Sequence, residues 1–65
     1  MNDEEKKQKM LEYVKELFAL KVKYGLKPTE IRVNPNDEFL TKFGTICGLK
    51  VVHDYNVQPG NLILL

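Results

Sequence analysis

The chain has 65 residues, enough for one domain with one small hydrophobic core. Ten Lys and Arg residues against nine Asp and Glu residues give a formal net charge of +1, which argues against a nucleic-acid-binding module. One cysteine, Cys47, excludes an intrachain disulfide, and with one histidine it argues against a four-ligand zinc site. Since small domains usually need a disulfide, a metal or an oligomer for stability, we expect a homo-oligomer without cofactors.

No apolar run is long enough to cross a membrane, and the N-terminus lacks the layout of a signal peptide. We therefore expect a cytoplasmic protein that makes no membrane contact. A lone thiol also suits a reducing compartment.

Residues 2–24 are predicted to form the first helix. Asn2 can act as the N-cap, with Glu5 as the reciprocal partner of a capping box. Gly25 suits the left-handed residue that commonly follows a helix.

This helix carries a broad apolar stripe at helical spacing. The stripe consists of Met10, Leu11, Val14, Leu17, Phe18 and Val22, extended on one flank by Tyr13, Leu20 and Tyr24. It is wider than one small sheet needs, so the surplus predicts contact with a second copy of the chain.

The middle of the chain predicts a short strand followed by a short helix. Residues 29–33 alternate between apolar and charged side chains, as in a half-buried strand. Asn34 and Pro35 fit the first positions of a helix, which Gly44 would end.

The C-terminal third contains two apolar runs, 49–52 and 62–65, separated by a polar stretch that ends in Pro59-Gly60. The strands expected there cover 49–53 and 62–65. These runs predict a β-hairpin or a strand–loop–strand pair, with residues 45–48 as a connector. Four consecutive apolar residues at 62–65 are typical of a strand buried on both faces. On an open edge they would invite aggregation, so either position favours a partner chain.

The predicted order is therefore α-β-α-β-β. We expect a single α+β domain over residues 1–65, with a small mixed sheet covered by helices. Residues 1–26 would form the helical part and residues 27–65 the αβ part.

The only residues that suggest polar catalysis are Cys47, His53 and Asp54. A Cys-His pair can generate a thiolate nucleophile, but no third orienting group and no oxyanion-hole motif accompany it. We interpret Cys47 as a small buried apolar residue and expect no enzyme. A pH-sensing role for His53 stays open. Tyr55 and Val57, in the following loop, point either to a partner or into the core.

Residues 27–65 resemble part of the major capsid protein of tailed bacteriophages. In that family a strand runs into an Asn-Pro helix start, a short aromatic-bearing helix follows, and a Gly-led strand and a Pro-Gly turn precede a last apolar strand. The chain departs from this pattern at Lys50, where the family usually has proline. The resemblance implies a phage or prophage origin and a mixed α/β module without catalytic residues. The matching residues are Ile31, Val33, Asn34, Pro35, Phe39, Gly48, Leu49, Val51, Val52, Pro59, Gly60, Leu62, Ile63 and Leu64.

The first functional hypothesis is a non-enzymatic phage interaction protein that self-associates and binds a host or phage protein. The alternatives are an anti-defence protein that sequesters a host nucleotide signal between subunits, and a virion-assembly accessory protein. Each would act in the host cytoplasm. The candidate interface residues are Leu11, Phe18, Leu20, Tyr24, Leu62 and Leu64, and the candidate ligand residues are Arg32, His53, Tyr55 and Asn56.

Overall fold

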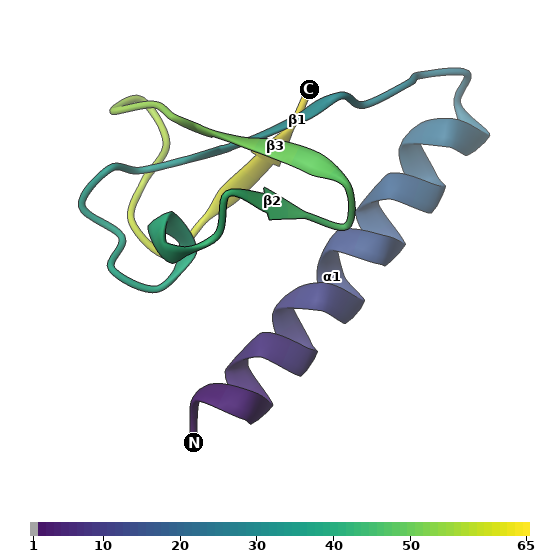
Figure 1. Cartoon of the computed structure of the whole chain (residues 1–65). Helices are drawn as coiled ribbons and strands as arrows, with labels where there is room; N and C mark the ends of the chain where they lie inside the picture. The colour runs from purple at the N-terminus through teal and green to yellow at the C-terminus, as the bar shows by residue number, and fades with distance from the viewer. Residues whose placement is uncertain (1) are drawn as a thin grey trace.

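The computed structural model describes residues 2–65. It contains one α-helix, α1 (Asp3–Lys23), one short 3-10 helix, η1 (Leu40–Lys42), and a four-stranded sheet. The helix passes obliquely across one face of the sheet (Figure 1). The predicted α+β class is confirmed. The prediction of a sheet covered by helices is wrong, because among residues 2–65 α1 is the only α-helix.

Both predicted ends of α1 are confirmed. The Asn2 side chain accepts a 2.9 Å hydrogen bond from the Glu5 N–H, which satisfies a donor left unpaired in the first turn. Gly25 has a positive φ of 79°, and the N–H groups of Gly25 and Leu26 bond back to carbonyls of the last turn. This pair of bonds is the usual way for a helix to stop at a glycine.

The strands lie in the order β2-β3-β1-β4. They are β1 (Glu30–Val33), β2 (Thr45–Ile46), β3 (Leu49–His53) and β4 (Leu62–Leu64). Strand β1 is parallel to β3 and antiparallel to β4.

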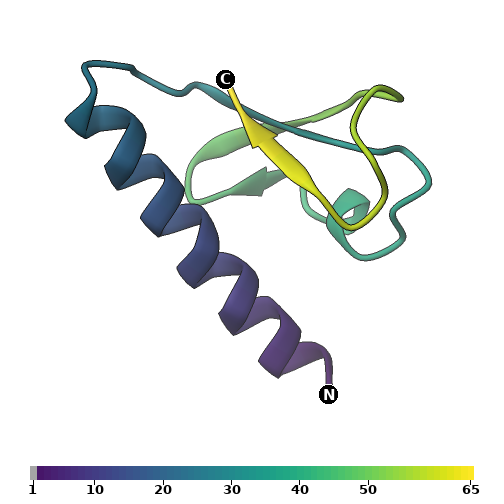
Figure 2. The same cartoon turned by 180° about the vertical axis from the view of Figure 1, so that it is seen from behind.

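The predicted hairpin between the last two strands is therefore wrong, because β1 lies between β3 and β4. The connecting loop is long enough to carry the chain across β1, and this insertion leaves Ile31 and Val33 without measurable exposure. The last strand is consequently an edge strand and is not buried on both faces; seen from behind, β4 lies in front of the sheet (Figure 2).

The helix predicted to begin at Asn34 and Pro35 is not formed. The Asn34 Oδ1 accepts a 2.7 Å hydrogen bond from the Asn36 N–H, so this side chain closes a local turn and does not cap a helix. The helix that does form between Asn34 and Gly44 is η1, a single short 3-10 turn.

The predicted connector at residues 45–48 instead begins a β-hairpin. Strand β2 pairs antiparallel with β3, and a two-residue turn joins Ile46 to Leu49. Cys47 and Gly48 both have positive φ, 51° and 79°, as the preferred two-residue hairpin turn requires. Cys47 is exposed at this turn, so its predicted burial is wrong.

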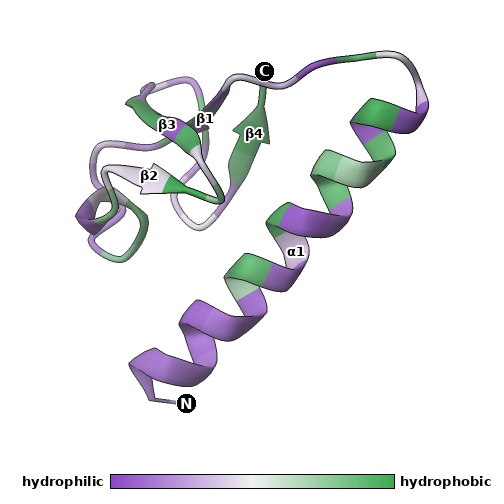
Figure 3. Ribbon diagram, turned by 45° about the vertical axis from the view of Figure 1, so that its right-hand side comes forward, coloured by the Kyte–Doolittle hydropathy of each residue, from purple (hydrophilic) through white to green (hydrophobic). Residues whose placement is uncertain are grey.

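The core lies between α1 and the inner face of the sheet. Figure 3 shows that the apolar residues of α1 occur in its later turns, whereas the first turns are hydrophilic. The buried cluster consists of Met10, Val14, Ile31, Val33, Leu40, Ile46, Leu49 and Leu64.

Candidate functional site

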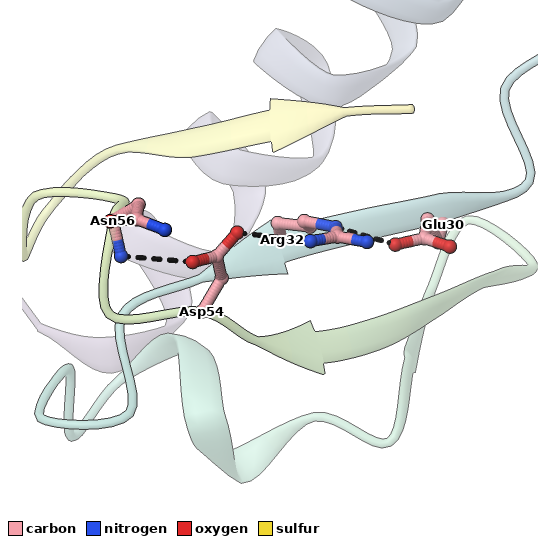
Figure 4. Close-up of polar contacts among 4 residues, drawn as sticks. All are labelled: Glu30, Arg32, Asp54 and Asn56. Atoms are coloured by element: carbon pink, nitrogen blue, oxygen red, sulfur yellow. Dashed lines mark hydrogen bonds and ion pairs between the residues drawn. The ribbon is translucent and has the colours of Figure 1, made fainter.

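The first polar cluster lies around Arg32 in the centre of the sheet, on the face opposite to α1 (Figure 4). The Arg32 Nε is 2.7 Å from the Glu30 Oε2, and the Arg32 Nη1 is 3.1 Å from the Asp54 Oδ2. The Asn56 N–H donates a 2.9 Å hydrogen bond to the other oxygen of Asp54.

These contacts shift two pKa values in opposite directions. The hydrogen bond from the Asn56 backbone and then that from Arg32 lower the pKa of Asp54 below its usual 3.8. The hydrogen bonds to Glu30 and Asp54 raise the pKa of Arg32 above its usual value. Since two carboxylates already neutralise Arg32, this cluster fastens the loop after β3 to the sheet and offers no spare cation to a ligand.

The second candidate is a groove of about 940 Å³ between the first half of α1, the 56–61 loop and the start of β4. Its size is in the usual range for small-molecule sites. Lys6, Lys9 and Tyr13 line the helical side, since residues three, four and seven apart share a helix face. The amide side chains lining it are Asn56, Gln58 and Asn61, and its apolar lining consists of Met10, Phe39, Leu40, Val57, Leu62 and Ile63.

The charged side chains of this groove differ in whether they already have hydrogen-bond or ion-pair partners. Lys6 Nζ lies 5.9 Å from the centroid of the Phe39 ring, and within residues 2–65 neither Lys6 nor Lys9 forms an ion pair. The carboxylate of Asp37 accepts bonds from the N–H groups of Phe39, Leu40 and Gly60, at 2.9–3.1 Å. Asp37 is thus occupied in holding the loop, whereas the two lysines are available to an anion.

The third feature is the outer edge of β4. Glu30 and Leu65 exchange both backbone hydrogen bonds at 3.0 Å. Because N–H and C=O groups alternate in direction along a strand, Ile63 also faces β1, and the backbone groups of Leu62 and Leu64 face the open edge. Residues 61–65 include no charged side chain and no proline, the usual protections of an edge strand.

The structure separates the predicted interface residues into two groups. Leu11 and Phe18 pack against the core with Leu62, and Leu64 is buried in it. Leu20 and Tyr24 are 48 % and 71 % exposed, which leaves them available to a partner.

The predicted ligand residues are only partly brought together. Arg32 and Asn56 belong to the cluster around Asp54, whereas His53 ends β3 as an exposed residue. Tyr55 is 76 % exposed and Val57 is buried, so the two loop residues take opposite positions. Of the four predicted ligand residues only Asn56 lines the groove, where the buried Val57 joins it.

Sequence reasoning missed Lys6 and Lys9, which were part of a charge run that reads as solvent-exposed. The signal in the sequence was their spacing to Tyr13 along one side of α1, but the other walls of the groove come from residues 37–40 and 56–63, far away in sequence.

Comparison of the chain with protein-family models, with curated proteins and with solved structures finds no match. In the described range, 2–65, no helix has the length and apolar character needed to cross a membrane. The same residues contain no group of three His, Cys, Asp or Glu side chains arranged to hold a metal ion.

Proposed function

We propose that this protein is a small non-enzymatic interaction protein that self-associates and binds a partner. The observation that carries the proposal is the edge of β4, an apolar strand whose outward backbone groups have no partner among residues 2–65. Such an edge is a ready template for another strand. The β4 strand of a second copy of the chain can pair with these backbone groups, so no other component is needed.

The surface of α1 next to this edge supports the same proposal. Tyr13 lines the groove together with Leu62, so this flank of α1 lies beside β4. Leu20 and Tyr24 follow Tyr13 at helical spacing, and all three are about half exposed or more. Exposed large apolar side chains grouped along one flank of a helix are typical of a protein interface.

The groove supplies the surface for the second partner. Its two available lysines favour a partner that presents a carboxylate or phosphate beside an apolar group. The support for a phage origin is the resemblance of residues 27–65 to the capsid module, and a host or phage protein is the partner that this origin suggests.

A second candidate function is the capture of a small anionic ligand, such as a nucleotide signal, at the boundary between subunits. Lys6, Lys9 and Tyr13 favour it, because they combine positive charge with an aromatic ring in one groove. A thermal-shift measurement with pyrophosphate and with mononucleotides tests it, since binding to the folded state raises Tm. No shift at millimolar concentration, or an equal shift in Lys6→Gln/Lys9→Gln, would count against it.

Light scattering on the pure protein at tens of micromolar tests self-association. We expect a dimer for the wild type and a monomer for Ile63→Lys, because a lysine on an edge strand opposes pairing with another strand. Thr45→Lys is the matched control, since Thr45 is an exposed residue on the opposite edge strand. A monomeric wild type overturns the proposal.

A further inference from the structure

We infer that two copies of the chain pair β4 with β4 in an antiparallel manner, with the twofold axis at Ile63, to form one continuous eight-stranded sheet. This inference rests on the proposed self-association and adds its geometry. It follows from the direction of the backbone groups along β4 and from the flank of α1 beside it.

The directions of the backbone groups select the register. In an antiparallel pair, two residues that exchange hydrogen bonds must both point their N–H and C=O groups toward the other strand. On the open edge only Leu62 and Leu64 do so within β4. An axis at Ile63 places Leu62 of each copy opposite Leu64 of the other. Each of these two pairs exchanges two hydrogen bonds, so four form in total. An axis at Leu62 or at Leu64 leaves only one hydrogen-bonded pair of residues within β4. A register shifted by one residue from the one centred on Ile63 leaves no such pair, because it sets outward-facing residues opposite inward-facing ones.

The side chains of β4 are compatible with this register. Ile63 of one copy lies directly opposite Ile63 of the other, in the closer type of antiparallel pair, on the sheet face that α1 does not cover. Leu62 and Leu64 extend the inner apolar face across the axis. No charge lies on β4, and each chain carries a net charge of only +1, so electrostatic repulsion between the copies is weak.

The same axis brings the two helices together. The first half of α1 lies near Leu62 and Ile63, whereas Lys21 lines a small pocket with Leu64 and Leu65. Successive parts of α1 therefore lie near successive parts of β4, and the twofold axis sets the two helices antiparallel on one face of the joined sheet.

The exposed apolar area is sufficient for a modest dimer. Tyrosine side chains bury roughly 150–250 Å² each when covered, and aliphatic side chains roughly 60–120 Å². Two tyrosines and three aliphatic residues that are about half exposed or more therefore supply roughly 400 Å² per copy. Together with the backbone of β4, this approaches the lower limit of about 600 Å² per partner for specific interfaces. The five are Tyr13, Leu20, Tyr24, Ile63 and Leu65.

Disulfide cross-linking tests the register. In a Cys47→Ser background, Ile63→Cys places two thiols on directly opposed residues about 4.5 Å apart at Cα, within the range for a disulfide. We expect covalent dimer to form at least tenfold faster, with copper-phenanthroline as oxidant, than for Leu65→Cys. Leu65 is the matched control, because it lies on the same sheet face but opposite Asn61 of the other copy.

A second measurement uses two single variants. Asn61→Cys and Leu65→Cys chains should cross-link when mixed and should not cross-link separately. If light scattering shows a dimer but Ile63→Cys reacts no faster than Leu65→Cys, the register is overturned while self-association stands. A protein that stays monomeric overturns both.

Discussion

The side-chain amide of Asn34 donates a 2.8 Å hydrogen bond to the carbonyl of Val57, 23 residues further along the chain. Asn34 is only 6 % exposed, and its Oδ1 accepts the N–H of Asn36 at the same time. One side chain thus closes the turn after β1 and holds the loop that leads to β4. This contact keeps the groove-forming loop in place.

Asn34→Asp should destabilise the fold by about 2–3 kcal/mol, because the Val57 carbonyl loses its donor and faces a buried carboxylate. Urea denaturation measures the change. The exposed neighbour provides the control, since Asn36→Asp should cost less than about 0.5 kcal/mol. Equal losses in both variants would mean that the buried amide has no special role.

The cluster around Arg32 predicts a stability contribution that depends on pH. The pKa of Asp54 is lower in the folded state than its usual 3.8, so the folded state binds fewer protons in that range. The contribution is complete at neutral pH and is lost as the pH falls below 3.8 and through the lowered pKa. Arg32 stays protonated throughout and adds no pH dependence there.

Asp54→Asn should therefore lower Tm at pH 7, and its deficit relative to wild type should shrink toward pH 3. Glu38→Gln serves as the control, since Glu38 is exposed and within residues 2–65 forms no ion pair. A deficit for Asp54→Asn that stays constant down to pH 3 would contradict the proposed cause.

Gly48→Ala should destabilise the β2–β3 hairpin by about 1–2 kcal/mol, because alanine disfavours the positive φ of 79° at this turn. Gly44→Ala is a strict control: a Cβ added at either glycine meets nothing within 4 Å, and only Gly48 has a left-handed backbone. Thermal unfolding of both variants separates the backbone effect from packing. Similar losses at the two positions would refute it.

Val14→Ala should cost about 2 kcal/mol, since Val14 is wholly buried between α1 and the sheet. Val22→Ala, on the same helix at 51 % exposure, should cost less than about 0.5 kcal/mol. Denaturant titration of the two variants measures how firmly α1 packs on the sheet. A small loss for Val14→Ala would mean that the helix is not part of the cooperative core.

Features governed by local rules were predictable from the sequence. The ends of α1 follow from Asn2 and Gly25, and alternation within residues 30–33 was sufficient to predict β1. The period of apolar residues, 3.6 in a helix and 2 in a strand, indicates which side of an element is buried. It does not indicate which strands become neighbours.

The sheet order was not predictable for that reason. Nothing in the two apolar runs indicates that β1 separates them, because β3 and β4 both pair with β1, a strand far away in sequence. The turn at Cys47 was missed because a Cys-Gly pair is not among the usual hairpin dipeptides. The groove was missed because its two walls meet only after the sheet has formed.

The turn at Cys47 gives the molecule a natural attachment point for a spectroscopic reporter. It adjoins β2, and β2 and β4 are the two outer strands of the sheet, so a dye on this thiol lies at the opposite edge from β4. Because the sequence contains no other cysteine, maleimide chemistry labels a single position. Chains labelled separately with donor and acceptor dyes would therefore reveal association by energy transfer while the pairing strand keeps its native side chains.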